Sequence, residues 1–266
     1  MFSTKSIIYY VMIVGMICAW YGCGGRKNSI TMAGSTAFQP FAEKLAITYS
    51  KRCPGINISV QGGGSAVGIQ SAISGAADIG MADLYKLPPE AENLWRTVVA
   101  HDGIVIIVHP SNPVTNLTIT QIRDIYNGKI RNWKEVGGPE RSITVISRES
   151  GSGTRTSFEQ IVGGITLRND AIVQDSNGSI RTTVASSPDS IGYISHGLVN
   201  EQVKAIMVDG VECSIEAVKS GKYKLVRPVY LLSKKEPQGE VKKFIDWMSS
   251  DEGQRIIEES GLLRAK

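Results

Sequence analysis

Residues 143–158 read ITVISRESGSGTRTSF. The first five residues are mostly apolar and β-branched, which predicts a buried strand, and a helix is expected over residues 154–161. Between them lie Arg148 and a short loop of serine and glycine. A strand that leads through a glycine-rich loop into a helix is the repeating unit of α/β proteins. This stretch therefore predicts both the fold class and the place of a binding loop.

Two earlier loops have the same design, with glycine and hydroxyl residues between a strand and a helix. They read AGSTA at residues 33–37 and GGGSAVG at residues 62–68. A helix N-terminus presents unpaired backbone N–H groups and roughly half a positive charge, and glycine lets a ligand approach them closely. Any one such loop, taken alone, is better explained as an ordinary turn with a helix cap. Three of them, with Arg148 beside the third, predict a site for a small oxyanion.

A carboxylate follows the second of these helices, in the stretch DIGMAD at residues 78–83. Like charges repel, so Asp83 would favour anion binding only if the anion carries a proton that the carboxylate can accept. Hydrogenphosphate has such a proton and fully ionised sulfate has none. Asp83 is then a selectivity filter against the wrong anion. The alternative is that Asp83 is a turn residue or a helix cap.

Strand-like and helix-like segments alternate along nearly the whole chain, which predicts an α/β protein with crossover connections. The expected strands are residues 30–32, 56–60, 79–81, 104–109, 143–147, 172–174, 191–194 and 225–232. The expected helices are residues 38–50, 65–74, 118–126, 154–161, 240–248 and 253–260.

The clearest break in this pattern is HPSNP at residues 109–113, which predicts a boundary between two lobes. The last forty or so residues are too few to fold alone. We expect them to return to the first lobe, so that residues 29–108 and 227–266 form one lobe and residues 109–226 the other.

The composition excludes several classes of protein. With 42% apolar residues, 20% charged residues and 28 glycines, the chain is globular, and its net charge of +4 is spread without a basic stripe for nucleic acid. The three histidines form no metal-binding motif, and the glycine-rich loops lack the endings of a P-loop or a dinucleotide site. We therefore expect no catalytic residues, no metal and no cofactor.

The N-terminus predicts export. Lys5 is followed by an apolar run over residues 7–21, which is short of the ~20 residues that cross a bilayer and is typical of a signal peptide. Gly22 precedes Cys23, as in the lipobox where bacterial lipoproteins are cleaved and lipidated. Residues 1–22 are thus predicted to be removed and Cys23 to carry lipid, the alternative being an ordinary signal peptide. The remaining Cys53 and Cys213 are expected to be separate buried thiols, although an oxidising compartment outside the cytoplasm would also permit a disulfide between them.

The loops GST, GGGSAVG, DIGMAD and SRESGSGTR, in this order and spacing, resemble those of the substrate-binding protein of the high-affinity phosphate ABC transporter. Further similarity lies in QIRDIYNGKI at residues 121–130, in IGY at 191–193 and in FIDW at 244–247. The resemblance covers residues 29–260. It implies a two-lobed periplasmic-binding-protein fold of type II, in which each lobe is a mixed sheet flanked by helices and the ligand lies in the cleft.

The resemblance also implies the residues that contact phosphate. By position in the motifs they are Ser35, Thr36, Ala37, Ser65, Asp83, Arg148, Ser152, Gly153 and Thr154. Some relatives hold the arginine with an aspartate two residues later, where this chain has Ser150. Glu149 or a distant acid must then orient Arg148.

The function implied is that of a monomeric, lipid-tethered receptor, in the periplasm or on the outer face of the cytoplasmic membrane, that delivers phosphate to an ABC permease. Three other functions remain open. One is a receptor for another tetrahedral oxyanion, such as sulfate, molybdate or tungstate, against which Asp83 argues. Another is a secreted phosphatase, although no histidine lies in the three loops to act as a base. The third is a sensor or adhesin that keeps the phosphate-binding fold.

Overall fold

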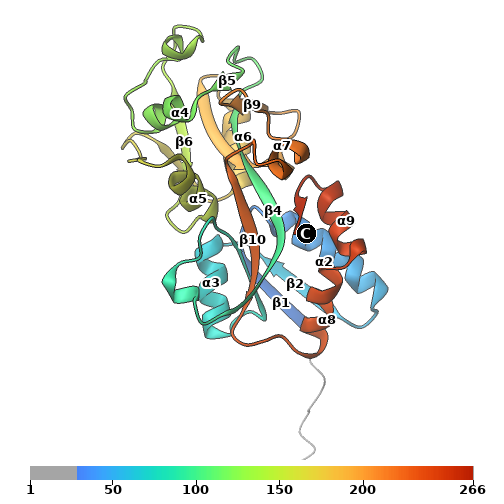
Figure 1. Cartoon of the computed structure of the whole chain (residues 1–266). Helices are drawn as coiled ribbons and strands as arrows, with labels where there is room; N and C mark the ends of the chain where they lie inside the picture. The colour runs from blue at the N-terminus through green and yellow to red at the C-terminus, as the bar shows by residue number, and fades with distance from the viewer. Residues whose placement is uncertain (1–28, 266) are drawn as a thin grey trace, which may run out of the picture.

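Two long strands, β4 (Trp95–Val108) and β10 (Val226–Ser233), run through the middle of the molecule and connect its two lobes (Figure 1). They pair in antiparallel fashion from Gly103 opposite Val226 to Trp95 opposite Ser233. The computed structural model describes residues 29–265. The predicted signal peptide and Cys23 lie outside the described residues.

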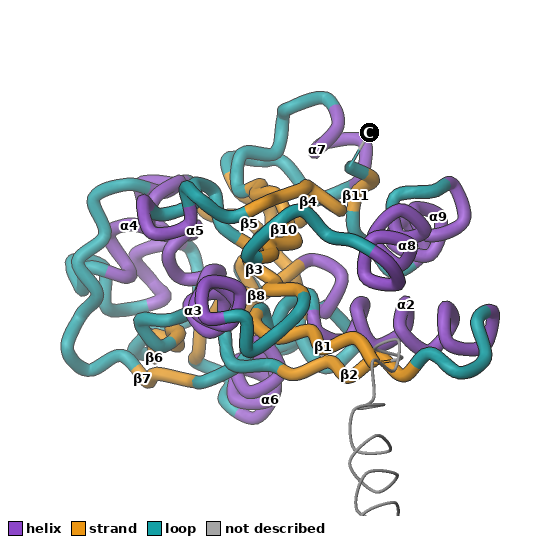
Figure 2. Tube along the Cα trace, turned by 90° about the horizontal axis from the view of Figure 1, so that it is seen from below, coloured by secondary structure: helices purple, strands orange, loops and turns teal. Residues whose placement is uncertain are grey.

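The first lobe, in the lower half of Figure 1, is a mixed sheet in the order β2-β1-β3-β10-β4. Helices α2, α8 and α9 pack on one face of this sheet and α3 on the other (Figure 2). Alternate residues of β3 therefore face different helices, as the two-residue period of a strand requires. The elements of this lobe besides the two long strands are β1 (Ser29–Gly34), α2 (Gln39–Arg52), β2 (Asn57–Gln61), α3 (Ser65–Ser74), β3 (Ile79–Asp83), the 3-10 turn Pro89–Ala91, α8 (Gly239–Met248), α9 (Asp251–Glu259) and β11 (Leu263–Arg264).

The second lobe, in the upper half of Figure 1, continues the sheet in the order β4-β8-β6-β7. Strand β9 also pairs with the end of β4, and β5 pairs with β9. Its elements are β5 (Asn116–Leu117), α4 (Ile119–Tyr126), the 3-10 turn Trp133–Val136, β6 (Thr144–Arg148), α5 (Gly153–Val162), β7 (Ile172–Gln174), α6 (Asn177–Ser186), β8 (Ser190–Ser195), the 3-10 turn His196–Leu198, β9 (Lys204–Val208) and α7 (Ile215–Lys219).

Strand β4 passes from one lobe to the other between Gly103 and Ile104. Its first part pairs with β10, whereas Ile104 and the four residues after it pair with β8 and pack in the core of the second lobe. Residues 104–108, which the break at residues 109–113 places in the first lobe, thus belong to the second core. Strand β4 therefore crosses the boundary between the lobes without interruption, while its pairing partner changes from β10 to β8.

The α/β class and the two-lobed architecture are confirmed. Every helix and strand expected from the sequence is present, with ends that differ by one or two residues, except that the strand expected over 104–109 is the second half of β4. The short strands β5 and β9 and the helices α6 and α7 were not expected from the sequence.

Close packing of α3 against the sheet depends on a glycine. A Cβ atom added to Gly68 would lie 2.2 Å from the carbonyl oxygen of Met81 on β3, a distance that no side chain tolerates. The last glycine of the stretch GGGSAVG therefore lets α3 lie directly on β3. This contact carries Ser65, at the start of α3, to the end of β3 where Asp83 lies.

The remaining cysteines are not paired with each other. Cys53 is half-buried and Cys213 is buried, and both are free thiols, which confirms that they are separate but corrects the expectation that both are buried. No helix within residues 29–265 has the length and apolar character needed to cross a membrane.

We predict that Ile106→Ala lowers the free energy of unfolding by about 2–5 kcal/mol, because the side chain on β4 is fully buried and its loss leaves a cavity. The control is Ile47→Ala on α2, where the same side chain is 58% exposed and the change should stay within about 0.5 kcal/mol. Denaturant unfolding measures both. Equal effects of the two substitutions would contradict this assignment of the core.

Candidate functional site

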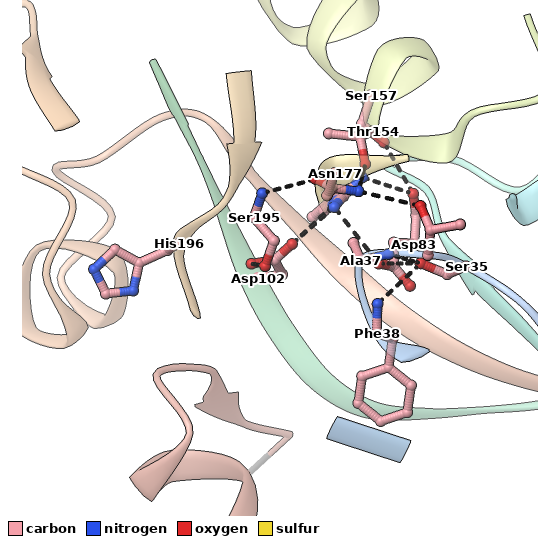
Figure 3. Close-up of polar contacts among 12 residues, drawn as sticks. Ser35, Ala37, Phe38, Asp83, Asp102, Thr154, Ser157, Asn177, Ser195 and His196 are labelled. Carbon is pink, nitrogen blue, oxygen red and sulfur yellow. Dashed lines mark hydrogen bonds and ion pairs between the residues drawn. The ribbon is translucent and has the colours of Figure 1, made fainter. Parts of the chain in front are cut away.

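Asp83, the last residue of β3, lies where the loops singled out in the sequence meet (Figure 3). Its side chain is 1% exposed. Its Oδ2 atom accepts a hydrogen bond of 2.6 Å from the Ser35 hydroxyl, and its backbone N–H donates to the Ser65 hydroxyl oxygen at 3.1 Å. The first and second loops are therefore both attached to Asp83, the first through its carboxylate and the second through its backbone N–H.

Ser35 supports the first loop from within. Its oxygen accepts hydrogen bonds from the backbone N–H groups of Ala37 and Phe38, both at 3.1 Å. A hydroxyl has one hydrogen, and the hydrogen of Ser35 is directed to Asp83. In this arrangement Ser35 positions Asp83 and the loop, and its hydrogen does not face a ligand.

The third loop belongs to the second lobe and lies against the first lobe at Gly153. A Cβ atom at this position would be 2.1 Å from the Ser65 oxygen and 2.4 Å from the Asp83 carbonyl oxygen. Only glycine permits such an approach. The GSGT motif therefore has a second role besides exposing helix N–H groups, since it lets the two lobes come together.

Several hydrogen bonds cross between the lobes around this point. The backbone N–H of Ala66 donates to the carbonyl oxygen of Gly151 at 3.1 Å. The hydroxyl of Ser157 accepts from the N–H of Tyr85 at 2.9 Å and donates to the carbonyl of Asp83 at 3.3 Å. The structure therefore has the two lobes closed on each other.

Arg148, at the end of β6, brings a buried positive charge to the same place. Its side chain is 1% exposed, and Glu149 binds it with both carboxylate oxygens, at 2.8 Å from Nε and from Nη2. The Nη2 atom also donates to the carbonyl of Asp175 at 3.1 Å. Glu149 thus orients Arg148, which answers the question raised by Ser150.

Helix α5 begins at the site. The Ser152 oxygen caps the helix by accepting from the N–H of Arg155 at 3.2 Å. Gly153 and Thr154 form its first turn, where backbone N–H groups have no partner within the helix. Both residues are buried, and a helix N-terminus of this kind can donate to an anion.

Asn177 is a further residue of the site that the sequence did not bring out. Its Nδ2 atom lies 3.4 Å from the Thr36 hydroxyl of the first lobe and 3.5 Å from the Thr154 hydroxyl of the second, and its Oδ1 atom accepts from the Ser195 N–H at 3.1 Å (Figure 3). The sequence does contain a pattern that points to Asn177. Residues 175–179 read DSNGS where β7 leads into α6, a fourth stretch of small and hydroxyl residues at the start of a helix.

Arg227 and Asp102 were also missed. Arg227 is fully buried on β10 and binds Asp102 on β4 through Nη2 at 2.8 Å and Nε at 3.2 Å. Its Nη2 atom lies 3.5 Å from Oδ2 of Asp83, and its Nη1 donates to the carbonyl of Asp83 at 3.2 Å. Arg148 is therefore not the only positive charge near the site, because the guanidinium of Arg227 lies behind Asp83.

Two buried polar atoms at this site have no partner in the protein. Within residues 29–265, three buried side-chain nitrogen or oxygen atoms lack a hydrogen bond, and two of them are Asp83 Oδ1 and Arg148 Nη1. One is an acceptor and the other a donor. Burial raises the pKa of Asp83 to about 6, against the opposing effects of Arg227, Ser35 and Arg148. At neutral pH Asp83 is therefore ionised and can only accept hydrogen bonds.

The histidines take no part in this site. His196 follows Ser195 but points away from the cluster, and its Nδ1 atom lies 3.0 Å from the carbonyl of Gly261 (Figure 3). Within the described part of the chain, no three His, Cys, Asp or Glu side chains are grouped to hold a metal ion. The site is suited to binding a protonated anion through neutral donors, one guanidinium and one acceptor.

Comparison with known proteins places this chain in a family. A model described as "PBP superfamily domain" matches residues 23–252. The phosphate-binding protein PstS of Bacillus subtilis is 32% identical over 235 residues, which is 87% of this chain and 78% of that protein. The chain belongs to the PstS family of the PBP superfamily.

Other members of the PstS family show how closely the chain follows it. PstS of Borreliella burgdorferi is 30% identical over 92% of this chain and 94% of its own length. A phosphate ABC transporter substrate-binding protein from Clostridium perfringens is 40% identical, and its crystal structure contains bound phosphate. It covers 90% of this chain and 100% of its own, with a TM-score of 0.87. The ABC-type phosphate transport receptor of Vibrio cholerae has a TM-score of 0.74 at 36% identity, covering 88% and 99% of the two chains.

We predict that Gly153→Ala weakens binding of inorganic phosphate, the ligand present in the Clostridium structure, by about tenfold or more. The added methyl group collides with atoms of the other lobe, so closure is hindered while each lobe still folds, and a loss of about 1.4 kcal/mol corresponds to a factor of ten. Titration calorimetry measures the affinity. Gly151→Ala in the same loop is the control, because its Cβ would meet nothing nearer than 3.5 Å. Equal affinities of the two variants would contradict the role of Gly153.

Proposed function

We propose that this protein is an extracytoplasmic receptor that binds hydrogenphosphate between its two lobes and delivers it to an ABC importer. The observation that carries the proposal is the pair of buried, unpartnered atoms Asp83 Oδ1 and Arg148 Nη1. A buried polar atom without a partner costs about 1–3 kcal/mol, more when it is charged, so a ligand that satisfies both atoms gains that energy. Hydrogenphosphate offers an O–H to the acceptor and ionised oxygens to the donor.

The remaining groups suit the other phosphate oxygens. Ser65 uses its oxygen to accept from Asp83 and keeps its hydrogen to donate. The backbone N–H groups in the first turn of α5, at Gly153 and Thr154, and the hydroxyl of Thr36 add neutral donors from both lobes. Closure excludes water and strengthens each of these hydrogen bonds, because the dielectric constant falls.

Competing functions fit this arrangement less well. Sulfate, molybdate and tungstate dianions bring no proton to Asp83 Oδ1 and would place a negative charge against an ionised carboxylate. We propose that the protein performs no chemistry on its ligand, since the histidine nearest in sequence to the site, His196, points away from it. The relatives are named as binding proteins and a transport receptor, which supports the same view.

The proposal includes a location and a mode of movement. We infer that Cys23 is lipidated after removal of residues 1–22 and that the lipid holds the receptor near its permease. We further infer that two bodies move against each other, one formed by residues 29–103 with 227–265 and the other by residues 104–226. The chain would then bend where β4 exchanges β10 for β8, between Gly103 and Ile104, and beside it where the chain enters β10 at Val226.

We predict that the purified mature chain binds one phosphate at neutral pH and rejects sulfate. In Asp83→Asn, the loss of affinity for phosphate should be smaller than the gain of affinity for sulfate. The Asn amide can donate to an unprotonated oxygen, which an ionised Asp83 cannot. In the wild type, sulfate binding should emerge as the pH falls through about 6, because the pKa of Asp83 lies there and the protonated carboxyl becomes a donor.

The matched control for this experiment is Asp78→Asn, at the other end of the same sequence stretch. Asp78 accepts from the backbone N–H and the hydroxyl of Thr31, on the side of the lobe away from the site. It should leave the preference for phosphate as in the wild type. Sulfate binding by the wild type at neutral pH would remove the filter role of Asp83. Binding of neither anion would refute the proposed function and favour a sensor or adhesin.

We predict that the chain expressed in a bacterium incorporates labelled fatty acid and partitions with membranes. Cys23→Ser should abolish both the label and the membrane partition, because the thiol is the atom that carries the lipid. Cys53→Ser is the control, since Cys53 lies in the folded domain. Labelling that survives Cys23→Ser would refute lipidation at this residue.

A further inference from the structure

Arg227 is a fully buried arginine that the proposed binding mechanism does not yet use. It lies on β10, and its cross-strand neighbour in register on β4 is Asp102, which is 1% exposed. Arg227 divides its guanidinium between two carboxylates, with hydrogen bonds of 2.8 and 3.2 Å to Asp102 and a contact of 3.5 Å to Oδ2 of Asp83. One buried cation thus serves two buried anions.

We propose that Arg227 is a positioning residue that keeps Asp83 ionised and turns its free oxygen toward the ligand, so that the site discriminates protonated from fully ionised oxyanions. This inference rests on the proposed phosphate-binding function. Asp102 has the shorter contacts to Arg227, and it also accepts a hydrogen bond of 2.7 Å from Ser195. Asp102 therefore holds Arg227 in place, and Arg227 in turn holds Asp83.

The geometry at Asp83 assigns its two oxygens to different tasks. Oδ2 receives the Ser35 hydroxyl at 2.6 Å and faces Arg227 Nη2. Oδ1 has no partner in the protein. With the carbonyl of Asp83 also bound by Arg227 Nη1, both the backbone and one side-chain oxygen are fixed. The remaining oxygen is therefore left free to accept a hydrogen bond from a ligand.

The charges around Asp83 act in opposite directions. The groups facing it are Arg227 on β10, Asp102 on β4 and Arg148 at the end of β6. Burial raises the pKa of Asp83, Arg227 is the strongest of the factors that lower it, and Asp102 raises it. Loss of Arg227 therefore favours the protonated carboxyl, which can donate to sulfate. Loss of the Asp102 charge favours the ionised carboxylate.

This opposition gives a test that separates positioning from ordinary structural support. Arg227→Met and Asp102→Asn break the same buried ion pair. If this pair were merely structural, the two substitutions would change the anion preference in the same way. Phosphate and sulfate affinities are measured by calorimetry at neutral pH, and thermal unfolding reports whether each variant is folded. The readout is the ratio of the phosphate affinity to the sulfate affinity.

We expect Arg227→Met to lower this ratio by about tenfold or more, since each unit of pKa changes the ratio of ionised to protonated carboxyl by a factor of ten. Asp102→Asn should hold or raise the ratio. If Arg227→Met does not fold, the double variant Arg227→Met/Asp102→Asn removes both charges, and replacing a whole buried pair is often tolerated. Its ratio should also fall, because the guanidinium that contacts Oδ2 and the carbonyl oxygen of Asp83 is lost.

Two results would overturn the inference: a wild-type ratio in the folded variant that lacks Arg227, or an equal fall of the ratio in Asp102→Asn. Failure of the proposed function is a different result. It would be seen in the wild type, as absence of phosphate binding or absence of discrimination against sulfate. A wild type that discriminates, beside an Arg227 variant that discriminates equally, rejects only the role of Arg227.

Discussion

The contact of Ser35 and Arg227 with one oxygen of Asp83 holds a carboxylate inside a site that is otherwise made of hydrogen-bond donors. Removing a carboxylate from water favours its neutral form, and burial does raise the pKa of Asp83. The structure opposes this with a hydroxyl and two guanidinium groups from different elements. The close approach of the two lobes at Gly153 and the close packing of α3 at Gly68 then bring the remaining donors near Asp83.

The sequence was informative about the site wherever a local pattern carries the chemistry. Glycine and hydroxyl residues between a strand and a helix have few other reasons to occur three times, and all three loops meet at Asp83. The resemblance to phosphate receptors added the individual contact residues. A motif gives the position of a hydroxyl but not the direction of its hydrogen, and the hydrogen of Ser35 is directed to Asp83, 48 residues away.

The parts that were missed depend on contacts between distant residues. The strand expected from the sequence starts at Ile104, whereas β4 starts at Trp95 and continues through Asp102 and Gly103, two residues that are common in turns. Asp102 is in fact an interior strand residue whose charge is balanced by Arg227, 125 residues later. No local pattern in either segment reveals that pairing. Asn177 differs, since the stretch DSNGS at the start of α6 has the same design as the other loops and on that ground predicts a fourth loop at the site.

The position of Arg227 and Asp102 also bears on how binding and closure are related. Arg227 lies on β10 and Asp102 on β4, close to the point between Gly103 and Ile104 where β4 exchanges β10 for β8. Asp83 pairs with Val229 of β10 in the same sheet. In the movement that we propose, Asp83, Arg227 and Asp102 would move with the first lobe, although Ser195 of the second lobe also donates to Asp102. The proton acceptor would then be in place before the lobes close, whereas Arg148 and the α5 donors would arrive with the second lobe. An anion without a proton would meet the repulsion of Asp83 in the open cleft, before the donors of the second lobe could offset it. On this proposal selection would precede closure, and the energy of closure would be released only for an anion that carries a proton.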